Sequence, residues 1–294
     1  MTDWLEVART ARARPSDPAL DFCKWPYTRP APPQPGALRS EALLYAACAA
    51  AGFDASMGQV LDRVRRVWGR FGTVWGVKWS GSHLSIELYF YDYARAGRSH
   101  GVTDFLTATR PLLHAPVSVD EALPYFMFSV EMAAETLHSG QLGQIDIYMG
   151  NPGSSVSSGI CYGLTQAGFE LRNFYFFFDA VHEAGAAWDK LTESVFLAAP
   201  TRLRRDDLVW PEMRGMQTVV VANKRHCDSL YFSRITVDQL AHFLDRLDFP
   251  GPIRRVLQEN RDLLAHHLYD AGWDFHCDAS GRVTPTKGSF YGLF

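Results

Sequence analysis

The sequence has few cysteines, no long apolar run and no Cys-x-x-Cys pair. Its five cysteines are Cys23, Cys48, Cys161, Cys227 and Cys277, and their odd number and wide spacing favour reduced thiols and a cytoplasmic protein. No apolar stretch approaches the roughly 20 residues that cross a bilayer. The first fourteen residues mix acidic residues and arginines and do not resemble a signal peptide. We therefore expect neither membrane insertion nor export.

Excess charge is also scarce. The net charge is −3, with a pI near 6.4, so no global positive field attracts nucleic acid, and nucleic acid is not an expected partner. Two arginine clusters, at 63–70 and 202–205, are predicted to be solvated surface. Neither a Gly-x-Ser-x-Gly elbow nor a His-Glu-x-x-His motif is present, which argues against the hydrolases that use them.

The triplet His-Cys-Asp occurs twice, at 226–228 and 276–278. The two His/Cys pairs could form a tetrahedral zinc site if the segments met. Structural zinc sites usually show closely spaced ligand pairs, so coincidence in polar turns is the favoured interpretation and no metal ligand is assigned.

Five prolines stand between residues 26 and 36. Because proline lacks the amide donor, this stretch is predicted to be an extended connector. We divide the chain into residues 1–36, an N-terminal extension with the proline-rich connector, and residues 37–294, a single domain. That domain is predicted to open with helices at 38–51 and 57–70, which have apolar residues at helical spacing.

From residue 73 the period of the apolar residues changes to two, which is typical of strands. Helices are expected at 180–197, 237–247 and 253–271, with a helical turn or long loop at 133–142. The predicted strand pairs are 73–79 with 84–92, 124–132 with 144–149, 156–164 with 169–178, 216–222 with 229–234, and 273–277 with 282–294. Local pairing favours antiparallel strands, and closing ten of them removes the edges. The predicted fold class is α+β, a closed ten-stranded antiparallel barrel with helices outside.

Alternation in 84–92 separates two kinds of face. Leu84, Ile86, Leu88 and Phe90 share one face, and Ser85, Glu87, Tyr89 and Tyr91 share the other. If the apolar face meets the helices, the second face lines a lumen of tyrosine, serine and charge that could hold a ligand. The alternative is a half-exposed sheet whose tyrosines face water.

The order and spacing of the strands resemble the aromatic prenyltransferases of the ABBA type, most closely their peptide-modifying cyanobactin branch. The similarity covers most of residues 73–294. It is carried by Val77-Lys78-Trp79 through Leu84, Tyr89-Phe90-Tyr91-Asp92, Ser158-Gly159-Ile160, Leu171-Arg172, Asp179, Leu230-Tyr231-Phe232 and Phe290-Tyr291.

The resemblance implies a cytoplasmic enzyme that transfers a prenyl group from a prenyl diphosphate to a nucleophilic or aromatic acceptor in the lumen. The acceptor is a small molecule or a ribosomally made peptide, and Mg²⁺ is a candidate cofactor. An allylic cation is stabilised by π-faces and must be shielded from water. The residues predicted to form its aromatic ring are Tyr89, Tyr91, Tyr148, Phe174, Phe176, Phe178, Tyr231 and Tyr291.

The diphosphate requires several cationic donors. Lys78 and Arg172 match basic positions of the family, and Lys224, Arg282 and Lys287 are further candidates. Glu87 is the predicted acceptor of the proton, with Asp146 and Glu131 as alternatives.

Four positions that carry inward cations in the family hold other residues in this chain. They are Ser85, Phe176, Ser233 and Gly292. A barrel that binds a ligand or peptide without catalysis, or one that performs another reaction on a peptide, therefore stays open. Three or more inward lysines or arginines near one mouth would favour the transferase over these alternatives.

Overall fold

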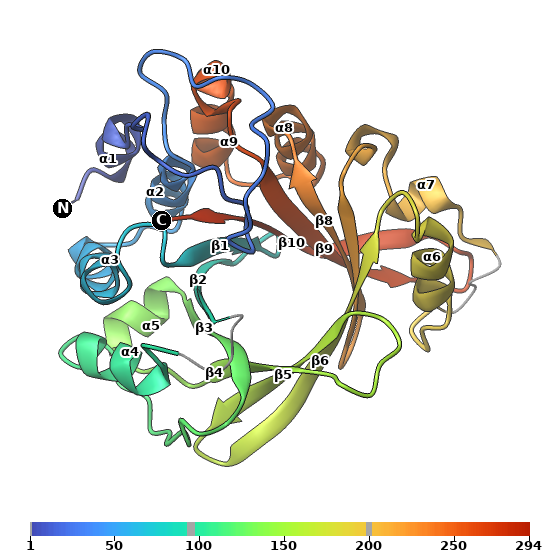
Figure 1. Ribbon diagram of the computed structural model, residues 1–294, viewed down its shortest axis with the longest axis horizontal. Helices are drawn as coiled ribbons and strands as arrows, with labels where there is room; N and C mark the ends of the chain where they lie inside the picture. Colours follow the sequence, from blue (N-terminus) through green and yellow to red (C-terminus); the bar gives the residue numbers. More distant parts are fainter. Residues whose placement is uncertain (1, 93–97, 198–201) are drawn as a thin grey trace.

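The strands form one closed antiparallel barrel in which every strand pairs with its sequence neighbours and β1 pairs with β10 (Figure 1). The computed structural model describes residues 2–92, 98–197 and 202–294. The strands are β1 (Val74–Trp79), β2 (Leu84–Tyr91), β3 (Tyr125–Met132), β4 (Ile145–Gly150), β5 (Ser158–Thr165), β6 (Gly168–Asp179), β7 (Thr218–Lys224), β8 (Asp228–Ile235), β9 (Tyr269–Cys277) and β10 (Val283–Leu293). The predicted fold class is confirmed.

Closure depends on the pairing of the first strand with the last. Val74 lies opposite Leu293 and Lys78 lies opposite Ser289 in an unbroken register. Because β1 also pairs with β2, no strand of the sheet is left with a free edge. Closure of this kind was expected from the ten predicted strands.

Helices cover the outside of the barrel (Figure 1). They are α1 (Trp4–Thr10), α2 (Glu41–Ala50), α3 (Ala55–Trp68), α4 (Val102–Thr109), α5 (Ala134–Ser139), α6 (Ala184–Thr192), α7 (Arg205–Leu208), the 3₁₀ turn η2 (Pro211–Met213), α8 (Val237–Arg246), α9 (Gly251–Glu259) and α10 (Arg261–Leu264). Helices α1, α4 and α7 and the turn η2 were not predicted from the sequence. Among the described residues, no helix is long and apolar enough to span a bilayer.

The main core lies between these helices and the outer face of the sheet. Leu88 and Phe90 of β2 pack there with Val60 of α3 and Phe105 of α4, all of them buried. Burial against the helices therefore explains why every second residue of these strands is apolar.

The predicted helix at 253–271 extends too far. Helix α9 ends at Glu259, α10 ends at Leu264, and β9 begins at Tyr269 rather than at residue 273. Asn260 interrupts the helical run with φ −121°. Tyr269 is fully buried in the core beneath the helices. Burial of this kind is common to helices and strands, so the sequence around Tyr269 did not reveal that its backbone is extended.

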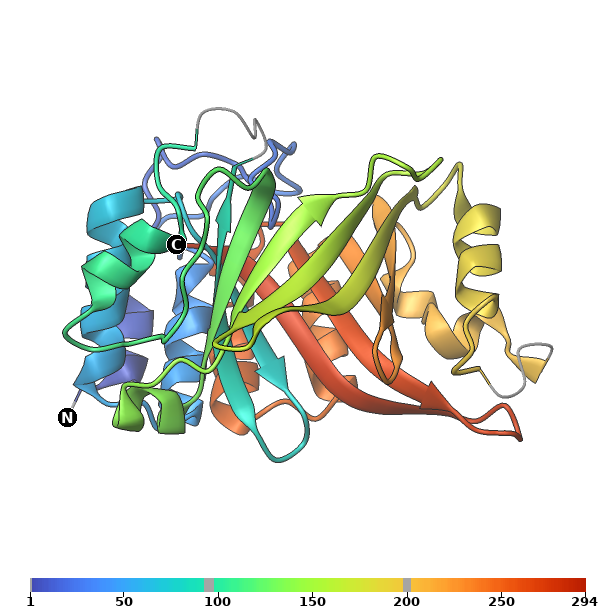
Figure 2. The same ribbon diagram turned by 90° about the horizontal axis from the view of Figure 1, so that it is seen from below.

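The two ends of the barrel differ. The turns that join β1 to β2, β5 to β6, β7 to β8 and β9 to β10 lie at one end, and the N-terminal coil lies at the other (Figure 2). We call these the hairpin end and the N-terminal end. A ligand would therefore meet different residues at each mouth.

Candidate functional site

The polar and aromatic faces of the strands point into the lumen. On β2, Tyr89 belongs to an interior cluster with Val74, Cys161 and Tyr291, whereas Ile86 and Leu88 belong to the core under the helices. The predicted inward face of tyrosines is therefore present, and the alternative in which these tyrosines face water is wrong.

Tyrosines line the middle of this lumen as a continuous band. Ring centroids are 5.7 Å apart for Tyr89 and Tyr291, 6.3 Å for Tyr291 and Tyr231, 6.2 Å for Tyr231 and Tyr175, and 6.1 Å for Tyr175 and Tyr148. We call these five residues the tyrosine belt. Burial raises the pKa of each phenol, so the belt is neutral and presents π-faces to whatever enters.

Two glycines make room for the belt. A Cβ at Gly76 would lie 2.7 Å from the ring of Tyr291, and a Cβ at Gly272 would overlap the ring of Tyr231. The absence of a side chain at these positions lets the tyrosines lie flat against the opposing strands.

The predicted places of Phe174, Phe176 and Phe178 in the aromatic ring are wrong. Phe178 is buried in the core under the helices, Phe176 packs against that core, and Phe174 shares their face by alternation. Nζ of Lys190 on α6 lies 4.4 Å from the Phe176 ring centroid. Tyr175 takes the inward place that the sequence analysis missed: the run from Phe174 to Phe178 is aromatic on both faces, so alternation alone could not choose between them.

Three lysines from three strands point into the lumen toward the hairpin end. Lys78 comes from β1, Lys224 from the end of β7, and Lys287 from β10. Lys224 and Lys287 share one carboxylate, that of Asp274, with Nζ–O distances of 2.7 and 2.9 Å. We call the three residues the lysine cluster. All three were predicted from the sequence as candidate diphosphate ligands.

The lysine cluster creates a locally positive region around Lys287. Burial lowers the pKa of Lys287, and the neighbouring charges of Lys224 and Lys78 lower it further, while Asp274 only partly compensates. The side chain of Lys287 is 32% exposed and so can be reached from the mouth. Because one carboxylate serves two lysines, this region keeps positive charge that attracts an anion.

Lys78 lies on the more acidic side of the lumen. It forms ion pairs with Glu87 and with Glu131, the latter at 2.7 Å. Burial disfavours the charged form of Lys78, but the two carboxylates outweigh that effect and raise its pKa. Lys78 is therefore a cation that is already neutralised by two partners.

Arg172 lies beside the bulge of β6, where the pairing with β5 shifts register. Its side chain is 40% exposed, and it lies 3.9 Å from Glu170. Its positive charge nevertheless opposes the rise in the pKa of Asp146 that burial causes. Arg172 therefore lies at the margin of the lumen rather than within the lysine cluster. Arg282, another candidate from the sequence, lies between β9 and β10, next to the turn at Asp278.

Glu87, the predicted proton acceptor, has its oxygens occupied. Lys78 pairs with it, and the hydroxyls of Tyr89 and Ser129 donate hydrogen bonds to it. It is almost fully buried beneath these partners, so it holds the lumen strands together and is poorly placed to accept a further proton.

Asp146 is the better-placed carboxylate. It lies on β4, and the amide of Gln144 donates a hydrogen bond to it at 2.5 Å. Burial raises its pKa to about 6, and the negative charge of Glu87 adds to the effect. A carboxyl with a pKa near 6 can both accept and return a proton near neutral pH.

No preformed metal site is seen among the described residues of the lumen. Within residues 2–92, 98–197 and 202–294, no group of three or more histidine, cysteine or carboxylate side chains is arranged to hold a metal ion. The lumen carboxylates Glu87, Glu131 and Asp274 instead pair with lysines. The Mg²⁺ expected from the resemblance therefore has no preformed protein site here, and no step below uses it.

A hollow of about 640 Å³ lies outside the barrel. Ala187, Trp188 and Leu191 of α6 line it together with Val219 of β7 and Leu230 of β8. The sheet separates it from the lumen, and none of the candidate residues predicted from the sequence lines it.

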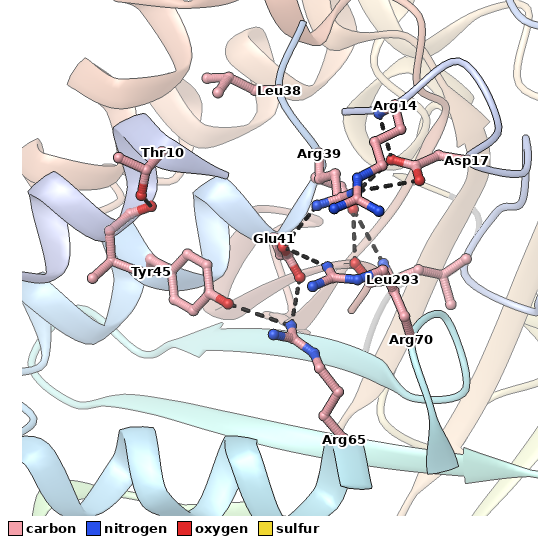
Figure 3. Close-up of polar contacts among 12 residues, drawn as sticks. Thr10, Arg14, Asp17, Leu38, Arg39, Glu41, Tyr45, Arg65, Arg70 and Leu293 are labelled. Atoms are coloured by element: carbon pink, nitrogen blue, oxygen red, sulfur yellow. Dashed lines mark hydrogen bonds and ion pairs between the residues drawn. The ribbon is translucent and has the colours of Figure 1, made fainter. Parts of the chain in front are cut away.

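The N-terminal coil is anchored beside its end of the barrel by a buried charge cluster (Figure 3). Asp17 of the coil pairs with Arg39 at 2.7 Å, and Glu41 of α2 pairs with Arg65 at 2.7 Å and with Arg70 at 2.9 Å. Arg65 and Arg70 were predicted to be solvated surface residues; Arg70 is exposed as predicted, whereas Arg65 is half-buried, and both pair with the buried glutamate.

No protein-family model matches the chain, and no curated protein matches it. The lumen geometry therefore carries the functional argument.

Proposed function

We propose that the barrel transfers a prenyl group from a prenyl diphosphate to a nucleophilic acceptor, a peptide side chain or an aromatic small molecule, bound in the lumen. The observation that carries the proposal is the lysine cluster beside the tyrosine belt. A diphosphate needs several cationic donors, and an allylic chain needs an apolar, aromatic wall. The lumen places the two next to each other.

In this proposal, the diphosphate enters the positive region around Lys287 and Lys224. The bond between C1 of the prenyl group and the diphosphate oxygen breaks, and the lysines neutralise the charge that the leaving diphosphate gains. The belt shields the allylic carbon from water and stabilises its positive charge. The acceptor atom then forms its bond to C1.

Asp146 takes the proton that the acceptor loses. Its pKa of about 6 means that it is largely ionised at neutral pH and free to accept a proton. Lys78 and Glu87 act indirectly in this scheme, because their ion pair joins the neighbouring strands β1 and β2 beside the belt.

A second function, binding a ligand without transferring a group, is favoured by the ion pairs. Every member of the lysine cluster already has a carboxylate partner. A diphosphate must therefore compete with Asp274 for Lys224 and Lys287, whereas a neutral aromatic ligand would need the belt alone.

Calorimetric titration with dimethylallyl and geranyl S-thiolodiphosphates, with and without Mg²⁺, separates these functions. The transferase predicts saturable micromolar binding of the diphosphates and at least tenfold weaker binding of geraniol, which lacks the anion. Binding of geraniol as tight as that of the diphosphate favours the non-catalytic barrel. A subsequent assay of diphosphate release with tyrosine- and tryptophan-containing peptides tests catalysis itself.

A further inference from the structure

The N-terminal coil carries a small preformed loop, residues 20–26. Leu20 and Pro26 form an antiparallel bridge at its base. Oδ1 of Asp21 accepts hydrogen bonds from the backbone amides of Cys23 at 3.0 Å and Trp25 at 3.2 Å. The loop therefore holds its own shape, and its tip presents the side chain of Phe22.

Phe22 is inserted against the tyrosines at the N-terminal end. Its ring centroid lies 4.4 Å from that of Tyr291, 5.8 Å from that of Tyr89 and 5.7 Å from that of Tyr91. Leu20 and Phe22 pack against the interior cluster that contains Cys161 and Tyr148. A side chain from outside the barrel thus covers the aromatic surface of the lumen.

Side-chain contacts of Asp21 and Lys24 hold the tip of the loop in place. Asp21 pairs with Arg234 at 2.7 Å, and Nζ of Lys24 lies 3.3 Å from the carbonyl of Gly72 and 3.4 Å from that of Tyr91. Arg234 has a positive φ of 60°, a conformation that costs free energy in a residue with a side chain. Trp25, at the other side of the loop, is 54% exposed.

The chain that leads into the loop is held as well. Asp17 and Arg39 form a nearly buried pair in which Arg39 donates two hydrogen bonds to the Asp17 carboxylate, of 2.7 and 3.2 Å. The short segment 20–26 therefore forms a cover over this end of the belt, held by side chains that single substitutions can remove.

We propose that residues 20–26 are a displaceable plug that closes the N-terminal mouth of the barrel by packing Phe22 against Tyr89 and Tyr291, so that access to the belt from this end requires the loop to move away. This inference does not depend on the reaction proposed above, because any ligand of the belt that enters from this end must displace Phe22.

Cys161 is a built-in reporter of access. It lies on β5, faces the lumen beside Tyr148, and is fully buried. Cys48 is equally buried, but it lies in α2, in the core outside the sheet. Alkylation of the full-length protein by N-ethylmaleimide, measured at each cysteine by peptide mass spectrometry, therefore distinguishes plug opening from global unfolding.

The two test variants are Phe22→Ala and Asp21→Asn. We expect each to raise the alkylation rate of Cys161 at least tenfold and to leave that of Cys48 unchanged. Asp206→Asn is the matched control, because it removes an exposed ion pair with Arg214 on the outside of the barrel and should change neither rate. Hydrogen exchange should also become faster in residues 20–26 of both test variants, but not in α2.

Equal Cys161 rates in wild type and both variants would overturn the proposal, because the lumen would then be reached without moving Phe22. A parallel rise at Cys48 would overturn it as well, since the variants would then act by unfolding the protein.

Discussion

Asp274 pairs with two lysines of the lumen, with 2.7 Å to Nζ of Lys224 and 2.9 Å to Nζ of Lys287. Burial works against ionisation of Asp274, but the two lysines outweigh it and lower its pKa, so the carboxylate is charged. One negative charge thus serves two positive ones. The arrangement leaves part of the cationic charge available to an anion that enters from the hairpin end.

This sharing makes Asp274 a competitor of any diphosphate. We expect Asp274→Asn to tighten the binding of geranyl S-thiolodiphosphate and Lys287→Gln to weaken it by about 10- to 100-fold, because a charge-assisted contact is worth roughly 1.5–3 kcal/mol. Calorimetry measures both affinities.

Tighter binding in Asp274→Asn together with weaker binding in Lys287→Gln would show that Asp274 competes with the diphosphate for the lysines. Asp274→Asn also leaves buried lysines unpaired and should reduce the free energy of unfolding, which urea titration measures. If both variants weaken binding equally, the ion pairs of Asp274 with Lys224 and Lys287 are structural and the positive region does not hold the diphosphate.

Asp146 should set the acidic limb of the pH–rate profile. Because it must be ionised to accept a proton and its pKa is about 6, kcat/KM should rise with pH through about 6. Asp146→Asn should lower kcat by roughly 10²- to 10⁴-fold and remove this limb. Glu131→Gln is the control. Burial would raise the pKa of Glu131, but the charge of Lys78 outweighs this effect and lowers the pKa to about 2. Glu131 therefore does not titrate near pH 6.

An acidic limb that persists in Asp146→Asn would assign the proton transfer to another group. Diphosphate binding measured in the same variant distinguishes a lost base from a lost site, since Asp146 lies outside the lysine cluster.

Neighbouring residues of β6 test the orientation of the strand. Tyr175 is in the belt and Phe176 packs under α6. Tyr175→Ala should weaken binding of the prenyl chain more than tenfold, whereas Phe176→Ala should leave binding unchanged and cost about 2 kcal/mol of stability. Calorimetry and urea titration of the pair measure the two effects, and equal loss of binding in both variants would contradict the assignment of faces.

The sequence predicted the strand pairs and most lumen residues because alternation was clean where one face was apolar. On β2 the change from Leu88 to Tyr89 to Phe90 separates core from lumen without ambiguity. On β6 both faces are aromatic, so no pattern could indicate that Tyr175 rather than Phe176 faces inward. The same rule succeeds or fails according to whether the two sides of a strand differ in polarity.

The loop around Phe22 and the pairing of Asp274 could not be predicted, because they join segments far apart in the chain. Asp274 and Lys224 are separated by 50 residues. Phe22 and Tyr291, whose rings are in contact, are separated by 269 residues (291 − 22). The prolines indicated a connector but not the part of the barrel that it contacts. The lysines at strand ends were predicted to bind an anion, but their carboxylate partner was not predicted.

Asp270 makes stability depend on pH at the plug. Burial raises its pKa to about 7, and the negative charge of Asp21 contributes, while Arg234 and Ser233 oppose the shift. Asp270 therefore stays protonated in the folded protein, while it ionises in the unfolded chain above pH 4. The folded state binds more protons in that window, so the contribution of Asp270 to stability falls as pH rises from about 4 to 7.

Asp270→Asn should remove this dependence, because asparagine resembles the protonated acid. We expect the two proteins to be similarly stable at pH 4. The wild type should then lose stability relative to the variant by up to about 1.4 kcal/mol per pH unit. Urea titrations at pH 4, 6 and 8 measure the difference, and parallel curves for both proteins would contradict the raised pKa.

Gly272 should be as sensitive as a core residue although it has no side chain. A Cβ there would overlap the ring of Tyr231, and Tyr231 is held between Tyr175 and Tyr291 at 6.2 and 6.3 Å, so the ring cannot move without disturbing the belt. Gly272→Ala should cost about 1–3 kcal/mol of stability and weaken binding of the prenyl chain. Gly185, whose added Cβ would meet nothing within 4 Å, is the control. If Gly272→Ala matches Gly185→Ala in both urea titration and calorimetry, the belt is loosely packed and Tyr231 is free to turn away.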